Sequence, residues 1–127
     1  MEMQQSKVRW FQTEWGVGKP SPAEEIIIKE LSKYMLWWNR EVSFEGLLLP
    51  TKGWARFDFH LEHFNTCIEY HGKQWHLSPE KQLADKIKAQ FCKDHDIRLI
   101  VWSGKDFYHI PGLVKGLMNE LGVKGWY

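Results

Sequence analysis

The sequence predicts a single α/β domain over residues 1–127, in which helices flank one mixed β-sheet. Three observations favour this class: a helix-start signal occurs twice, runs of alternating apolar and polar residues lie between the two signals, and a nearly continuous apolar run follows the second helix. Such apolar runs are typical of strands buried on both faces. We therefore expect the element order α-β-β-β-α-β-α.

The first helix is expected to begin at Ser21, after an irregular N-terminal segment over residues 1–20. Ser is a favoured N-cap, Pro suits the first helical position, and Glu24 stands where a capping box needs a Glu. Residues 41–49 then mix apolar and polar side chains, which predicts a strand. Residues 51–53, Thr-Lys-Gly, predict a turn before the next strand.

Residues 56–76 predict two antiparallel strands joined by a turn centred on His63 and Phe64. In that register the numbers of paired residues sum to 127, so Asp58 lies opposite Glu69. Like charges directly opposite each other are destabilising, and a divalent cation between them would remove the repulsion. Mg²⁺ and Mn²⁺ prefer hard oxygen ligands, so Asp58 and Glu69 are candidate metal ligands.

The second strand of this hairpin should place Cys67, Glu69 and His71 on one face and Ile68 and Tyr70 on the other. The remaining elements are a helix beginning at Ser78-Pro79-Glu80, a buried strand over residues 97–102, and a last helix from near Pro111 to Leu121 that ends at Gly122. Helical spacing places Lys81, Asp85 and Lys88 together on one side of the middle helix.

Composition narrows the possible classes of function but does not identify one. The formal net charge is +1, which does not by itself indicate a nucleic-acid-binding protein. Cys67 and Cys92 show no CxxC spacing, which favours a reducing compartment and hence the cytoplasm over a disulfide framework. The sequence shows neither a secretion signal nor an apolar run of about 18 residues, so we expect no membrane association.

Several motifs occur in an order that carries further information. They are Asp58-Phe59, Ile68-Glu69-Tyr70-His71-Gly72-Lys73-Gln74, Asp85 to Lys88, Phe91-Cys92 and the run Ile97 to Trp102. This ordered set, within about residues 21–105, resembles the PD-(D/E)XK nuclease superfamily. It is most similar to small phage and bacterial members akin to very-short-patch-repair endonucleases and some homing endonucleases. The third signature position, usually Lys, is His71 here.

The resemblance implies a restriction-endonuclease-like fold and Mg²⁺- or Mn²⁺-dependent endonucleolytic cleavage of DNA, by nicking or by cutting both strands. Asp58, Glu69 and the backbone carbonyl of Tyr70 would hold the metal, and Glu24 would complete a second metal site or orient water. His71, Lys73 and Gln74 each qualify for the work of the missing lysine. Contacts to DNA phosphates would come from four lysines: Lys73, Lys81, Lys86 and Lys88.

Alternatives stay open at this point. The interval of about 34 residues from Glu24 to Asp58 also resembles that of phage junction-resolving endonucleases, which act on branched DNA. A nuclease-like subunit that binds DNA without cutting it is another possibility. From a different class, a structural zinc module could use Cys67, His71, Cys92 and His95. Because one small domain contacts one scissile phosphate, cleavage of both strands would call for a homodimer or a second domain.

Overall fold

The computed structural model describes residues 8–13, 17–50, 53–72 and 78–126. Within them the fold is mixed α/β. The helices are α1 (Pro22–Leu31), α2 (Pro79–Asp94) and α3 (Ile110–Leu121), with short 3-10 helices η1 (Glu62–Phe64) and η3 (Gly104–His109). The strands are β1 (Trp10–Phe11), β2 (Asn39–Phe44), β3 (Leu48–Leu49), β4 (Gly53–Trp54), β5 (Phe57–Leu61), β6 (Thr66–His71) and β7 (Arg98–Ser103).

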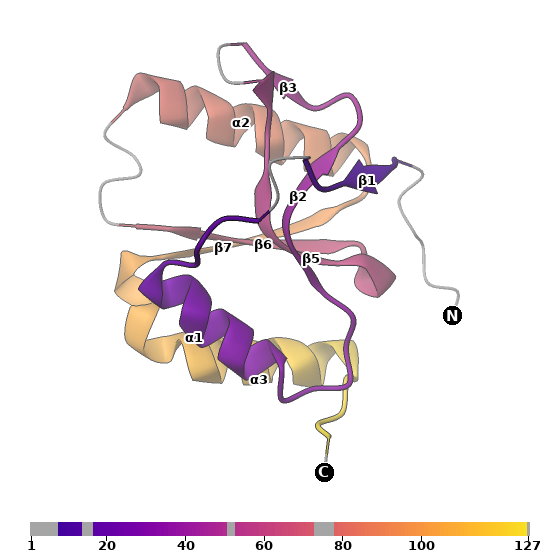
Figure 1. The fold of residues 1–127 in the computed structure, drawn as a ribbon, viewed down its shortest axis with the longest axis vertical. Coiled ribbons are helices and arrows are strands. Elements are labelled where there is room, and N and C mark those ends of the chain that lie inside the picture. Colours follow the sequence, from indigo (N-terminus) through magenta and orange to yellow (C-terminus); the bar gives the residue numbers. More distant parts are fainter. Residues whose placement is uncertain (1–7, 14–16, 51–52, 73–77, 127) are drawn as a thin grey trace.

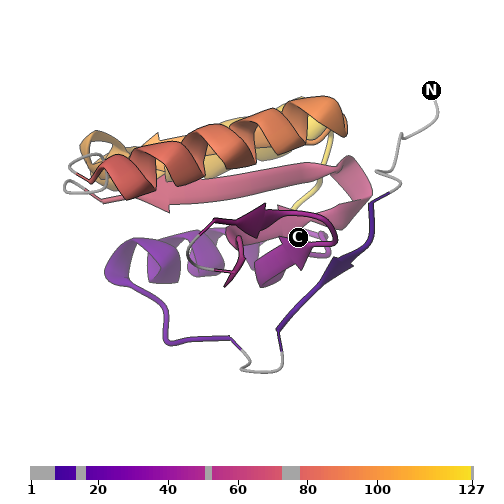
Figure 2. The same ribbon diagram turned by 90° about the horizontal axis from the view of Figure 1, so that it is seen from above.

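One mixed sheet with the strand order β1-β2-β5-β6-β7 lies between two helical layers (Figure 1). Strands β1, β2, β5 and β6 pair antiparallel in turn, whereas β7 runs parallel to β6. A parallel connection needs a crossover, and α2 supplies it. Helix α2 covers one face of the sheet, and α1 and α3 pack against each other on the opposite face. Seen from above, α2 runs lengthwise along β6 (Figure 2).

Two apolar cores lie on the two faces of the sheet. The core beneath α1 and α3 includes Ile27, Ile68 and Val114, and the core beneath α2 includes Phe57 and Cys67. Ile68 and Cys67 are successive residues of β6 that face opposite cores, and Tyr70 packs on the same side as Ile68. The predicted facing of this strand is confirmed, and it places Glu69 and His71 on the side of α2.

Local signals in the sequence set the ends of two helices as predicted. At α1 the Glu24 backbone N–H donates to Ser21 Oγ at 3.2 Å, and the Ser21 N–H donates to Glu24 Oε1 at 3.4 Å, which completes the capping box. Helix α3 ends at Gly122, whose φ of 72° is the left-handed conformation that glycine adopts without strain. No helix in the described parts of the chain has the length and apolar content that a membrane span requires.

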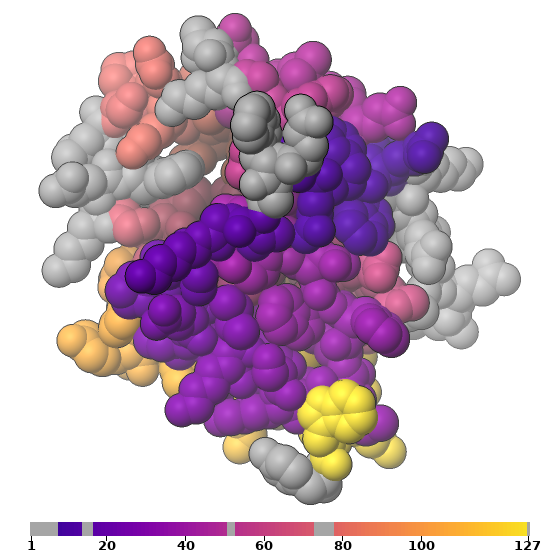
Figure 3. Space-filling model, in the orientation of Figure 1, coloured from indigo at the N-terminus to yellow at the C-terminus, as the bar shows by residue number. Residues whose placement is uncertain are grey.

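Two predictions about the first half of the chain are wrong. Residues 1–20 are not wholly irregular, because Trp10 and Phe11 form β1 and pair with Phe44 and Ser43 of β2. The space-filling view shows the N-terminal third, in indigo and violet, spread over the face toward the viewer (Figure 3). The expected strand over residues 41–49 is two strands: β2 ends at Phe44, and a turn at Gly46, with φ of 90°, leads to β3.

Candidate functional site

Asp58 of β5 and Glu69 of β6 are neighbours across the hairpin, as predicted. The two strands pair Phe59 with Ile68, and the pairing continues in the same register toward the turn. One step in the other direction brings Asp58 opposite Glu69. The side chain of Asp58 reaches across to β6, where its Oδ2 accepts a hydrogen bond of 2.8 Å from the backbone N–H of Tyr70. The hairpin therefore holds two carboxylates side by side.

The pKa of Asp58 reports how these carboxylates affect each other. The pKa of Asp58 is raised from 3.8 to about 7, chiefly by burial and then by the negative charges of Glu69 and Glu24. The hydrogen bond from Tyr70 and the positive charge of Lys88 act in the opposite direction. Without a cation, Asp58 therefore shares its site with a proton near neutral pH, and a divalent cation would compete for the same position.

Glu69 is paired with a lysine from the helix above it. The Lys88 ammonium donates a hydrogen bond to Glu69 Oε1, although the two residues are only 5% and 4% exposed. Lys88 also donates to the backbone carbonyl of Arg56 at 2.6 Å and lies 4.8 Å from the centroid of the Phe57 ring. Lys88 thus lies buried beside Glu69, and its contact with a DNA phosphate stays a prediction.

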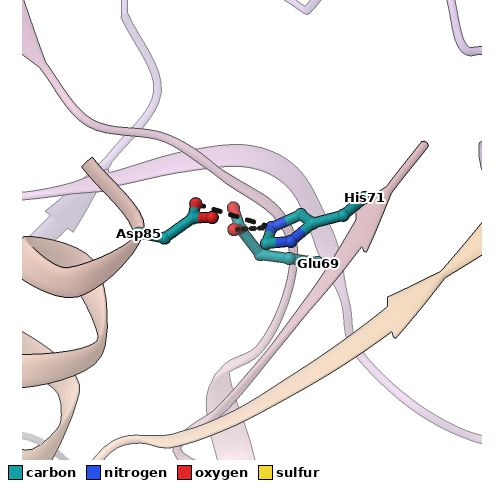
Figure 4. Close-up of side chains that lie close together, drawn as sticks. All are labelled: Glu69, His71 and Asp85. Atoms are coloured by element: carbon teal, nitrogen blue, oxygen red, sulfur yellow. Dashed lines mark hydrogen bonds and ion pairs between the residues drawn. The ribbon is translucent and has the colours of Figure 1, made fainter. Parts of the chain in front are cut away.

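A third group of side chains meets at His71 (Figure 4). Glu69 Oε2 lies 3.1 Å from His71 Nε2, and Asp85 Oδ1 of α2 lies 3.8 Å from the same nitrogen. Each of the three residues offers one possible ligand atom, and these three atoms lie within 4.8 Å of one another. Glu69 and His71 are buried and Asp85 is half-buried. The three side chains could therefore hold a metal ion together.

Glu24 lies near the site, but both of its carboxylate oxygens already have partners. Its Oε2 lies 3.3 Å from Arg40 Nη2, and its other oxygen accepts from Ser21 in the capping box. Arg40 also donates to the backbone carbonyl of Gly18 at 3.1 Å. Glu24 contributes to the raised pKa of Asp58, yet it does not join the cluster around His71, because α1 lies on the opposite face of the sheet.

The other predicted site residues have varied placements. On α2, Lys86 is exposed and Lys81 is half-buried. Lys73 and Gln74 lie outside the described residues. The structure joins Tyr70 to Asp58 through its N–H, and the use of its carbonyl as a metal ligand stays a prediction.

The geometry does not favour the zinc module. Burial raises the pKa of the Cys67 thiol and raises that of Cys92 to about 12, which disfavours the thiolate form that binds metal. His95 packs against Phe91, with ring centroids 4.3 Å apart and the ring planes tilted by 43°. Among the described residues, the cluster of possible metal ligands around His71 includes neither cysteine and does not include His95.

Sequence reasoning did not identify Asp85 or Lys88 as partners of the strand residues. A signal was present, because both lie on one side of α2 at a spacing of three residues. That spacing shows which residues share a helix face, but only the packing of the helix shows that this face points to Glu69. Arg40, which joins Glu24 to the N-terminal segment, was likewise not anticipated.

Comparisons with known proteins add no relative to this picture. No protein-family model matches the chain, and no match is found among curated proteins or solved structures. The functional argument therefore rests on the side chains and their arrangement.

Proposed function

We propose that the chain is a metal-dependent endonuclease that hydrolyses DNA phosphodiester bonds with Mg²⁺ or Mn²⁺. The observation that carries the proposal is the placement of Asp58 and Glu69 on adjacent strands with the Lys88 ammonium beside them. Phosphodiester hydrolysis requires compensation for the negative charge of the transition state and a positioned water. A cation held by two carboxylates, together with a buried ammonium, would meet the first requirement.

The topology supports a restriction-endonuclease-like fold. An antiparallel array of β2, β5 and β6 is followed by a crossover through α2 to β7, which runs parallel to β6. Helix α1 precedes the array and packs on the face opposite α2. This arrangement contains the order α-β-β-β-α-β-α that the resemblance implies, with the short strands β1, β3 and β4 added.

The donor set fits a hard divalent cation. Asp58 and Glu69 offer carboxylate oxygens, and the carbonyl of Tyr70 would be the third protein ligand. The repulsion that helps to raise the pKa of Asp58 is the interaction that a cation would reverse. When bound, Mg²⁺ or Mn²⁺ would polarise a phosphoryl oxygen and lower the pKa of a coordinated water.

The protein's own groups would orient these ligands. The Tyr70 N–H fixes the direction of Asp58, and Lys88 fixes one oxygen of Glu69. Lys88 would also offset negative charge near the scissile phosphate, which makes it a fourth candidate, beside His71, Lys73 and Gln74, for the work of the missing lysine. Exposed Lys86 would contact the DNA backbone farther away.

Both cysteines are free thiols, and we place the activity in the cytoplasm for that reason.

The test is DNA cleavage by the purified 127-residue chain. Supercoiled, linear, single-stranded and four-way-junction DNA would be incubated with Mg²⁺ or Mn²⁺, beside Asp58→Asn and the control Asp94→Asn. Asp94 lies exposed at the end of α2, where it accepts a hydrogen bond from Gln90. We expect wild type and the control to cut DNA, and Asp58→Asn to lose cleavage while it remains folded.

Other outcomes separate the alternatives. Exclusive cleavage of the four-way junction would identify a junction-resolving endonuclease. DNA binding without metal-dependent cleavage of any substrate would overturn the proposal in favour of a subunit that binds without cutting. If both strands are cut, light scattering with DNA should show a homodimer.

A further inference from the structure

We infer that Glu69, His71 and Asp85 form a second cation site, which takes a divalent transition metal such as Zn²⁺ or Mn²⁺. This site differs from the proposed Asp58 site in its ligands, because His71 and Asp85 are not metal ligands there. It also does not depend on DNA cleavage, since metal can bind whether or not the chain is a nuclease. Glu69 is the residue common to the two sites.

The first support is convergence from two rigid elements. β6 supplies Glu69 and His71, and α2 supplies Asp85. Both carboxylates point at one nitrogen of the imidazole, with His71 Nε2 at 3.1 Å from Glu69 and 3.8 Å from Asp85 (Figure 4). Ligands about 2 Å from a shared metal lie roughly 3–4 Å from one another. The three atoms therefore need only small adjustments to share an ion.

The second support is the chemistry of the donors. One imidazole nitrogen with two carboxylates is a mixed nitrogen and oxygen set, and imidazole suits Zn²⁺ and other transition metals, whereas Mg²⁺ favours oxygen alone. Three protein ligands leave an open position for water or substrate. The preference for the metal should therefore run Zn²⁺ above Mn²⁺ above Mg²⁺, whereas the oxygen ligands of the Asp58 site suit Mg²⁺ or Mn²⁺.

The third support is the way Glu69 is held. Its Oε1 accepts from the Lys88 ammonium, which leaves Oε2 free to contact His71 Nε2, the nitrogen that Asp85 also approaches. Lys88 and Asp85 are three residues apart on α2, so one helix face both orients the shared carboxylate and completes the ligand set. A cation on His71 Nε2 would take this nitrogen out of acid–base chemistry, so His71 would then be a metal ligand and not a general base.

Isothermal titration calorimetry on the chelator-treated 127-residue chain tests the inference, with Zn²⁺, Mn²⁺ and Mg²⁺ as separate titrants. We expect one equivalent of Zn²⁺ to bind, more tightly than Mn²⁺ and far more tightly than Mg²⁺. Loss of a mere supporting partner of a metal ligand costs about 10- to 100-fold in affinity. Asp85→Asn, which removes a ligand, should therefore weaken Zn²⁺ binding by at least that much, and Asp85→Glu should recover part of it.

Three controls keep the result specific. Asp94→Asn, on the same helix, should bind Zn²⁺ as wild type does. Cys92→Ala should do so as well, since the buried thiol is not a ligand of this site. Asp58→Asn should retain Zn²⁺ binding even where it abolishes cleavage, so failure of the proposed nuclease and failure of this site are separate results. Equal Zn²⁺ affinity in wild type and folded Asp85→Asn, or no Zn²⁺ binding by wild type, would overturn the inference.

Discussion

Lys88 of α2 donates a hydrogen bond to Glu69 of β6, and both side chains are almost completely buried. From the sequence alone, loss of Glu69 is expected to relieve repulsion with Asp58 and to leave stability unchanged or higher. The structure gives the opposite sign, because loss of Glu69 leaves a buried ammonium without its carboxylate. Breaking one side of such a pair is strongly destabilising.

We therefore expect Glu69→Gln to lower the free energy of unfolding of the metal-free protein by about 3 kcal/mol. Urea unfolding at neutral pH measures this change. The matched control is Glu120→Gln, which breaks the exposed pair with Arg98 and should cost less than about 1 kcal/mol. In the double variant Glu69→Gln and Lys88→Met, part of the loss should return. Equal effects of Glu69→Gln and Glu120→Gln would contradict the burial argument.

Asp58→Asn should stabilise the metal-free protein at neutral pH. The folded pKa of Asp58 is about 7, above its ordinary value of 3.8, so between these values the folded state holds a proton that the unfolded state has released. The contribution of this group to stability therefore falls as pH rises from about 4 to about 7. The Asn side chain still accepts from Tyr70 and carries no charge.

The measurement is the free energy of unfolding against pH in the presence of a chelator. Wild type and Asp58→Asn should agree at the acid end, and the variant should become progressively the more stable of the two toward neutral pH. Parallel curves would show that Asp58 has the same pKa in the folded and unfolded states.

His60 should give a pH dependence of the opposite sign. Its ring packs against Trp10 and Phe44, with centroids 5.4 and 5.3 Å away, and burial lowers its pKa from 6.5 to about 4. In this range the unfolded state binds the proton and the folded state does not, so stability falls as pH drops from 6.5 to about 4. His60→Phe should flatten this acid limb in the same unfolding series. An unchanged limb would assign the acid sensitivity to other groups.

Two glycines of the last helical segment should respond in opposite directions to alanine. Gly122 has φ of 72°, which strains any residue with a Cβ, so Gly122→Ala should cost about 1 kcal/mol. Gly116 lies within α3, and a Cβ there would meet no atom within 4 Å. Gly116→Ala should therefore stabilise by about 0.5–1 kcal/mol through helix propensity. Thermal melts of both variants report the signs, and a gain from Gly122→Ala would contradict the assigned backbone conformation.

Much of the fold could be predicted because its signals are local. Ser21 and Glu24 form the capping box, Gly122 ends α3, and the hairpin register follows from a short turn. β1 could not be predicted, because a pair of residues such as Trp10 and Phe11 becomes a strand only through pairing with β2.

The site, like the fold, has one part that local sequence signals predict and one part that they do not. The nearness of Asp58 and Glu69 follows from the register of adjacent strands, which the sequence contains. The contacts of Lys88 and Asp85 with β6 depend on how α2 is rotated as it packs on the sheet. The apolar core between α2 and the sheet, which includes Phe57 and Cys92, sets that rotation, and no local motif encodes it.

The three-residue spacing of Asp85 and Lys88 on α2 limits how the length of this helix can vary. Each residue of an α-helix turns the chain by about 100°. One residue inserted between Asp85 and Lys88 would leave only one of them facing Glu69, and the residue that turned away would lose its role. Insertions before Asp85 or beyond Lys88 would keep the two residues in phase, so natural length variation in α2 should avoid the stretch between them.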